Sequence, residues 1–316
     1  MRFGLRQGSL GVLHPSTLKA ITAITMGSMA DSKAYSLPRD ASESARLEAQ
    51  HHVWVTNIGF LFHPTITASL PEHATLGEVA TGTGIWLLDN ARSSKSHGKS
   101  HQYYGLDLSS AQFPSKYPDN VEFDELNILD SSVPEDWKNR FDALHVRLLV
   151  CGLSRSEDWK RALSNLIAML KPGGWLQWEE ADFEHCVGAQ NVPDPAAAKA
   201  LTHFEQNAIA LLKTMGRMNP EAAMLDSLFA KARLEDVQRD VFASDRVAET
   251  RAGFTEAILG AGEGIIKMVF AAQGGKVEGF EREECEAIAK KARDGAEGGK
   301  AYYRGDLIVT IGRKPR

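Results

Sequence analysis

The sequence predicts an α/β protein built on a mostly parallel β-sheet. Short apolar runs alternate with amphipathic helical stretches, which is typical of βαβ units. A glycine-rich loop joins the first of these runs to a helix. In addition, 43% of the 316 residues are hydrophobic, enough for a large core, which excludes a wholly disordered chain. Ligands of such sheets bind at the carboxyl ends of the strands.

Charge and cysteine content narrow the functional class. The formal net charge is −5, whereas a nucleic-acid binder normally has a strong basic excess, so we expect no nucleic-acid partner. The three cysteines form no CxxC pair, and we expect reduced thiols, no metal site and a cytoplasmic protein. No apolar run reaches the roughly 18 residues of a membrane span, so we expect no membrane partner.

The N-terminal residues differ from the rest. Residues 1–30 lack Asp and Glu but contain three basic residues, Arg2, Arg6 and Lys19. This composition resembles a mitochondrial transit peptide. The alternative is a disordered tail, or a later translation start at Met26 or Met29. We therefore expect residues 1–34 to be a disordered tail or a transit-like segment.

The predicted elements follow in order along the chain. A helix is expected over 40–62, because Asp40 can cap it, Glu43 completes a capping-box pattern, and Pro38 and Pro64 punctuate its ends. Five apolar segments that alternate with turns and helices are predicted strands: 75–80, 102–109, 120–130, 141–153 and 174–182.

The second half is predicted to be more helical. Apolar residues at helical spacing predict helices over 157–171, 193–216 and 220–234, and a mostly helical region over 251–297. The sequence Pro-Gly-Gly after Lys171 is a stop signal for the first of these helices. Strands are expected at 236–243 and 302–314.

The loop Thr81–Gly84 carries the most specific signal. A dinucleotide fingerprint needs a third glycine, but the chain has Leu87 there, which disfavours a nicotinamide oxidoreductase. A phosphate loop needs Gly-Lys-Ser/Thr, which the chain lacks. Glu78 at the start of the loop would repel a pyrophosphate, and Asp107 at the end of the next strand can take both hydroxyls of a ribose. The pair predicts a site for a cationic nucleoside.

Several motifs now resemble a known family. In order, the segments EVATGTGIW, GLDLS, NILD, FDALHVR and LKPGGWLQWEE resemble the class I S-adenosylmethionine-dependent methyltransferases. The segment that begins YSLPRD and ends QH resembles the fungal secondary-metabolism methyltransferases, a group that includes a velvet-complex regulator and a few pericyclases. The resemblance covers 35–182 and 302–314.

The resemblance implies a Rossmann-like, seven-stranded sheet with a reversed last hairpin and an N-terminal helix. The cofactor-binding core would comprise 35–184 and 301–316, and residues 185–300 would form a mainly helical lid over the substrate. S-adenosyl-L-methionine is the implied cofactor. Its implied contacts are Glu78, Ala80, Gly82, Gly84, Asp107, Leu108, Asn127, Ile128 and Arg147. Ala80 replaces the family's usual first glycine, and its methyl group could crowd the cofactor.

Catalytic and substrate residues are predicted around this core. The candidates for proton transfer and charge are His51, His145 and Arg147, because histidine titrates near neutral pH and the latter two alternate on one strand face. The alternative is that both histidines are structural. Apolar and amide side chains predicted to contact substrate are Gln50, Trp54, Phe62 and Phe204, which could equally be core residues.

These observations favour a methyltransferase that acts on oxygen or nitrogen of a small, largely apolar metabolite. One alternative is a methyltransferase-like cyclase, in which the bound sulfonium acts only as a positive charge. A second is a non-catalytic regulator that binds a partner protein. The N-terminal helix is a candidate surface for a homodimer.

Overall fold

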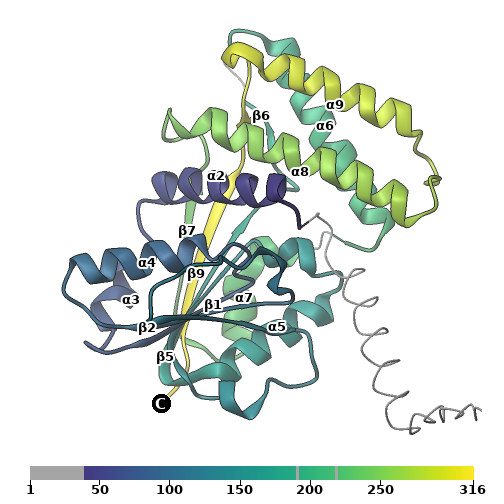
Figure 1. The fold of residues 1–316 in the computed structure, drawn as a ribbon. Helices are drawn as coiled ribbons and strands as arrows, with labels where there is room; N and C mark the ends of the chain where they lie inside the picture. The colour runs from purple at the N-terminus through teal and green to yellow at the C-terminus, as the bar shows by residue number, and fades with distance from the viewer. Residues whose placement is uncertain (1–38, 190–191, 218–219) are drawn as a thin grey trace, which may run out of the picture. The chain divides into compact units, whose positions relative to one another are not determined.

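The computed structural model describes residues 39–189, 192–217 and 220–316. The predicted tail over 1–34 lies outside these residues. A seven-stranded sheet forms the centre of the fold, with the order β3-β2-β1-β4-β5-β9-β7 (Figure 1). Its strands are β1 Thr75–Val79, β2 Gln102–Asp107, β3 Val121–Glu125, β4 Phe141–Arg147, β5 Leu170–Ala181, β7 Glu235–Ala243 and β9 Asp306–Arg313.

The last strand is reversed, as the family resemblance implies. Strands β3, β2, β1, β4 and β5 pair in parallel, whereas β9 inserts antiparallel between β5 and β7. The parallel strands end at one edge of the sheet, so the side chains at their carboxyl ends gather there. A separate two-stranded sheet pairs β6 Val187–Gly188 with β8 Tyr303–Arg304.

Eight α-helices are assigned within the described part of the chain. They are α2 Ala41–Ile58, α3 Pro64–Ser69, α4 Ile85–Ser96, α5 Ser156–Met169, α6 Pro195–Thr214, α7 Leu225–Lys231, α8 Thr250–Ala272 and α9 Arg282–Ala296. Short 3-10 helices cover Ser110–Gln112, Glu135–Trp137, Leu149–Gly152, Pro220–Met224 and Glu297–Gly299.

The two faces of the sheet bury separate apolar clusters. One cluster packs Leu144 and Leu176 of the sheet against α5 and α7. The other joins Ala143 and Trp175 to α2, α4 and the helices α6, α8 and α9. Because neighbouring residues of a strand point to opposite faces, the continuous apolar runs predicted as strands are those of a sheet covered on both sides.

Helices α6, α8 and α9 pack against one another and form a cap, and α8 also lies along α2 (Figure 1). Glycines permit this close packing: a Cβ added at Gly253 would clash with Val53 of α2, and one added at Gly262 would lie 2.5 Å from Phe204 of α6. Residues 185–300 are not one continuous helical region: between α6 and α8, helix α7 packs on the sheet and β7 is one of its strands.

Two local predictions need correction. The helix expected over 40–62 ends at Ile58, because Gly59 adopts a left-handed conformation with φ 91° and terminates it. Asp40 caps this helix by accepting the N–H of Glu43 at 2.9 Å, but the Glu43 carboxylate pairs with Arg46, so the capping box is only half formed.

The helix expected over 157–171 also ends early, at Met169. Strand β5 begins at the next residue, and Pro-Gly-Gly lies within it, where the register with β4 shifts between Phe141 and Ala143. Proline has no N–H for a regular ladder, so the stop signal coincides with an irregularity of the strand pairing.

Candidate functional site

The glycine loop connects β1 to α4 at the carboxyl edge of the sheet. Ala80, Gly82 and Gly84 have φ values of 59°, 54° and 71°, in the left-handed region that favours glycine. A Cβ added at Gly84 would lie 2.5 Å from the ring of Phe123, so this position requires glycine for space as well as for conformation. Ala80 has the same backbone conformation with a methyl group, and is the strained member of the loop.

Asp107 faces this loop from the end of β2, as predicted. Its carboxylate accepts the N–H of Gly82 at 2.8 Å and that of Ser109 at 3.3 Å. Burial raises the pKa of Asp107, against the effect of these N–H groups. A carboxylate has about four acceptor positions, so these N–H groups leave capacity for a hydroxyl donor.

Glu78 is buried on β1 and lies within a cluster of charged side chains. Its Oε2 accepts the Thr81 hydroxyl at 2.5 Å, and its Oε1 lies 3.3 Å from Nδ1 of His145 on β4. The other ring nitrogen of His145 lies 3.3 Å from Oε1 of Glu179 on β5. The ring of Trp86 stacks on that of His145, with centroids 3.7 Å apart. Both ring nitrogens of His145 thus face carboxylates, although neither makes a hydrogen bond to the described residues.

The strand pairing explains this cluster. His145 pairs with Glu78 on one side and with Gln177 on the other, and Arg147 pairs with Glu179. Since alternate residues share a face, the predicted pair His145 and Arg147 lies on the same face as the two glutamates. Burial favours a raised pKa for Glu179, but His145, Arg147 and Gln177 together lower it overall.

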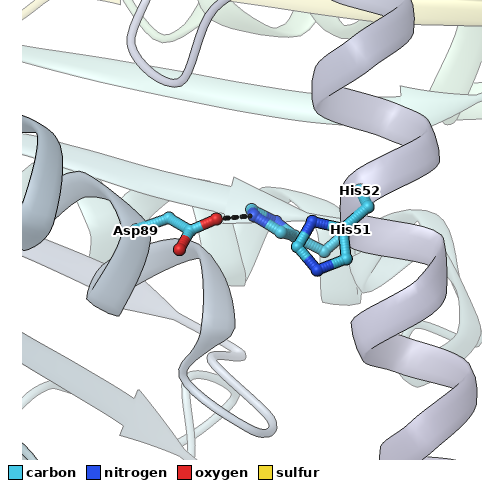
Figure 2. Close-up of side chains that lie close together, drawn as sticks. All are labelled: His51, His52 and Asp89. Atoms are coloured by element: carbon cyan, nitrogen blue, oxygen red, sulfur yellow. Dashed lines mark hydrogen bonds and ion pairs between the residues drawn. The ribbon is translucent and has the colours of Figure 1, made fainter.

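His51 of α2 meets this cluster through Arg147. Nη2 of Arg147 lies 3.1 Å from Nδ1 of His51, and Nε2 of His51 lies 2.9 Å from Oδ2 of Asp89 on α4 (Figure 2). Burial and the positive charge of Arg147 lower the pKa of His51 to about 4, against the opposing effect of Asp89 and Glu78. The imidazole is therefore neutral at pH 7.

Arg147 retains hydrogen-bonding capacity. Its Nη1 is buried and has no hydrogen-bond partner among the residues that the structure describes. Burial lowers the pKa of Arg147, and the carboxylates of Glu179 and Glu78 oppose that shift. The ring of the predicted substrate residue Trp54 lies 5.9 Å from the guanidinium carbon.

Gln177 fixes the segment after α2 to the site. Its Nε2 donates to Oε1 of Glu179 at 2.6 Å and to the carbonyl of Leu61 at 2.7 Å, and its Oε1 accepts the N–H of His63 at 2.7 Å. This segment carries Phe62, whose ring meets that of Trp86 edge-on at 4.9 Å. Phe62 thus lies beside the cluster, where it is buried within the apolar core.

The other predicted residues are more dispersed. Half-buried Gln50 precedes His51, and half-buried Leu108 follows Asp107. The Asn127 side chain accepts the N–H of Leu129 and donates to Asp130, and Ile128 is buried beside it. Phe204 is fully buried against Gly262 in the core of the cap, so it supports the packing of α6 on α8 rather than joining the cluster around Arg147.

His51, His52 and Asp89 have ligand-type atoms that all lie within 4.8 Å of one another (Figure 2). A metal ion would need the lone pair of a histidine nitrogen. Arginine only donates hydrogen bonds, so Nδ1 of His51 must accept from Arg147, and the ring proton lies on Nε2. The proton then points at Asp89, and Nε2 has no lone pair for a metal in this arrangement.

The sequence does not single out Trp86 and Asp89 as site residues, whereas the alternation of Gln177 and Glu179 on one strand face does suggest a carboxylate that could orient a substrate. Trp86 and Asp89 are three residues apart on α4, and therefore lie on one helix face directly after the glycine loop. Gln177 and Glu179 alternate on β5, as His145 and Arg147 do on β4. Both spacings can be read from the sequence, but neither identifies the residue on another helix or strand that each side chain contacts.

Among the described residues, no helix combines the length and the apolar character needed to cross a bilayer.

No protein-family model matches the chain. The chain is 36% identical over 295 residues to Methyltransferase grgD of Penicillium sp., a match that covers 90% of this chain and 97% of that protein.

Two further relatives are methyltransferases as well. N-methyltransferase gliN of Aspergillus fumigatus is 33% identical over 184 residues, which span 55% of this chain and 62% of that protein. Methyltransferase pytC of Aspergillus terreus is 25% identical over 299 residues, which span 89% and 84% of the two chains. None of the three is named as a cyclase or a regulator. With its reversed seven-stranded sheet and its similarity to grgD over nearly the whole length, the chain belongs to the fungal S-adenosylmethionine-dependent methyltransferases.

Proposed function

We propose that the chain transfers a methyl group from S-adenosylmethionine to a nitrogen or oxygen atom of a small, largely apolar metabolite. The observation that carries the proposal is the carboxyl edge of the sheet, where the glycine loop, Asp107 and the buried Glu78 cluster meet. That the relative gliN is named an N-methyltransferase supports nitrogen as an acceptor.

The residues present fit this cofactor. Thr83 Oγ1 and Arg147 Nη1 are buried without hydrogen-bond partners in the described part of the chain, so the site offers polar atoms for a ligand. When bound, the cofactor supplies an electrophilic methyl group on a sulfonium sulfur. Acidic Glu78 would hold its amino group, and Asp107 its ribose. The methyl group of Ala80 is the one departure from an all-glycine loop.

Further cofactor contacts are proposed for the glycine loop and for the segments that follow β2 and β3. The loop residues Gly82 and Gly84 would leave space for the methionine part. Leu108 would lie beside the ribose, and Asn127 and Ile128 beside the adenine. Trp54 and Phe62, with Gln50, would contact the acceptor, because they adjoin His51 and Trp86.

The two histidines have different roles in this proposal. His51 accepts the proton of the acceptor, because its imidazole is neutral and its Nδ1 has a lone pair. His145 holds Glu78 and Glu179 in place, because each of its nitrogens faces one of them. A positioned base typically contributes about 10²–10⁴-fold to a rate.

Calorimetric titration with S-adenosylmethionine tests the cofactor site. Hydrogen bonds to charged groups contribute about 1.5–3 kcal/mol, so Asp107→Ala and Glu78→Ala should each weaken binding about 10- to 100-fold. Glu125→Gln is the matched control, because Glu125 pairs in register with Asp107 on the next strand and its carboxylate binds Ser110. Unaltered affinity in the two alanine variants would defeat the assignment.

Methyl transfer itself is tested with methyl-labelled cofactor and a fungal metabolite extract, read by mass spectrometry. Label in one metabolite would identify the acceptor class. An isomerised but unlabelled product would instead show a cyclase.

We also propose that the protein is cytoplasmic and that it forms a homodimer. One face of α2 packs on α8 and α4, so only its outer face, which carries His52, is available for a second copy. Size-exclusion chromatography with light scattering tests the dimer.

A further inference from the structure

Three side chains from three elements form one hydrogen-bonded line that the cofactor site does not require. Asp89 comes from α4 and its Oδ2 lies 2.9 Å from Nε2 of His51 on α2 (Figure 2). Arg147 comes from β4, and its Nη2 lies 3.1 Å from Nδ1 on the other side of the imidazole. His51 is fully buried. Asp89 lies three residues after Trp86, and its other oxygen pairs with Arg92 at the surface.

The donor and acceptor roles along this line are fixed by chemistry. A guanidinium group donates and cannot accept, so Nδ1 of His51 must be unprotonated. The single proton of the neutral ring is then on Nε2, and it is donated to the Asp89 carboxylate. Asp89 thus selects one tautomer and one ring orientation, with the basic nitrogen directed toward the charged cluster around Arg147.

We propose that Asp89 is a positioning residue for methyl transfer, which holds His51 so that Nδ1 takes the proton of the acceptor. This inference rests on the proposed function. An acceptor N–H or O–H replaces Nη2 of Arg147 at Nδ1. The acceptor would then gain one methyl group as the S–CH3 bond of the bound sulfonium breaks and leaves a neutral thioether, and it would give up one proton to Nδ1. The ring would become an imidazolium whose Nε2–H remains bonded to the Asp89 carboxylate. The proton passes to solvent after the product leaves.

The charges around His51 are compatible with this step. Arg147 and burial disfavour the imidazolium, whereas Asp89 and Glu78 favour it. His52 is its neighbour on α2 and is exposed. Movement of Arg147 toward an oxygen atom of the acceptor would remove the nearest positive charge, and Asp89 would then stabilise the protonated ring.

A second histidine of the same protein provides an internal comparison. Nδ1 of His63 accepts the backbone N–H of Thr65, and its Nε2 lies 3.1 Å from Oδ2 of Asp240. His63 therefore has the same tautomer and the same carboxylate partner. Its Nδ1 is occupied by a backbone N–H of α3, so this pair is a matched control without a role in proton transfer.

The first experiment reads the tautomer without any enzymatic activity. Protein with ¹⁵N-labelled histidine is observed by NMR as wild type, Asp89→Ala and Asp240→Ala, and His51→Gln assigns the signal. We expect an unprotonated Nδ1 in wild-type His51, a mixture of tautomers in Asp89→Ala, and no change of the His51 signal in Asp240→Ala. A protonated Nδ1 in the wild type would overturn the proposal. The proposal would also be overturned if zinc chloride removed the Nε2 proton in the wild type but not in His52→Ala. The cluster would then be a metal site.

The second experiment measures turnover on the acceptor found by mass spectrometry. Asp89→Ala should lower kcat about 10- to 100-fold, part of the contribution of a positioned base, and shift the acidic limb of the pH profile. Cofactor affinity should change less than about twofold, and Asp240→Ala should behave as wild type. Normal kcat and an unchanged pH profile in Asp89→Ala would overturn this inference but leave the proposed function intact. Absence of methyl transfer by the wild type would instead remove the proposed function.

Discussion

The substitution Glu205→Gln should make the protein more stable at pH 8 but not at pH 5. Glu205 lies on α6 and is only 5% exposed. Burial raises the pKa of its carboxyl group to about 8. The folded protein therefore keeps Glu205 protonated at neutral pH, a state that glutamine imitates in shape and charge.

The sign and size of the effect follow from proton linkage. The carboxyl group of an unfolded glutamate has a pKa of about 4.3, so between about pH 5 and pH 8 the folded protein holds a proton that the unfolded chain has lost. The free energy of unfolding then falls by about 1.4 kcal/mol per pH unit through this group, or about 4 kcal/mol over the interval. The amide of the glutamine variant does not titrate, so this slope disappears in it.

Urea denaturation at pH 5, 6, 7 and 8 measures the difference between wild type and variant. The two free energies of unfolding should be similar at pH 5 and diverge steadily toward pH 8, with the variant the more stable. Glu283→Gln on the exposed surface of α9 is the matched control and should give no divergence. A constant difference between Glu205→Gln and wild type at all four pH values would refute the reasoning, because it would mean that Glu205 is ionised throughout.

Two further substitutions test the packing and backbone strain. Ala80→Gly should raise the free energy of unfolding by about 1 kcal/mol, because it removes the cost of a left-handed alanine at φ 59°; an unchanged urea midpoint would contradict this strain. Gly262→Ala should cost about 1–3 kcal/mol, because its Cβ would lie 2.5 Å from the ring of Phe204. Gly260→Ala is its control in the same denaturation experiment, since the nearest atom is 3.4 Å away, at the flexible side chain of Arg46.

The order of elements could be predicted from the sequence because local signals determine it. The glycine loop, the first parallel strands and the capped N-terminal helix all depend on residues close together in the chain, and the structure confirms each of them. The family resemblance implied seven strands and a reversed last hairpin, but not the order of the strands. No local signal places β9 between β5 and β7, since β7 and β9 are separated by the whole of α8 and α9.

The packing of the cap helices could not be predicted from the sequence for a different reason. Periodicity predicted its helices, but their packing depends on where glycines face a neighbour. Gly253 and Gly262 allow α8 to approach α2 and α6 closely. In the sequence these glycines lower the helix propensity of the segment, and only the three-dimensional partners, Val53 and Phe204, reveal their purpose. This is also why Phe204 could be predicted as a substrate contact and yet lies in the core of the cap.

The two candidate bases show most clearly what the sequence could not decide. His51 and His145 are the same residue type, and each lies on a predicted inward-facing position. What separates them is the group opposite the second ring nitrogen. For His145 it is a carboxylate on either side, so neither ring nitrogen faces a hydrogen-bond donor. For His51 it is the donor Arg147 on one side and the acceptor Asp89 on the other, which leaves one basic nitrogen. These partners lie on other strands and helices, so the assignment of proton acceptor and counter-ion depends on contacts between elements that residue spacing along one element does not contain.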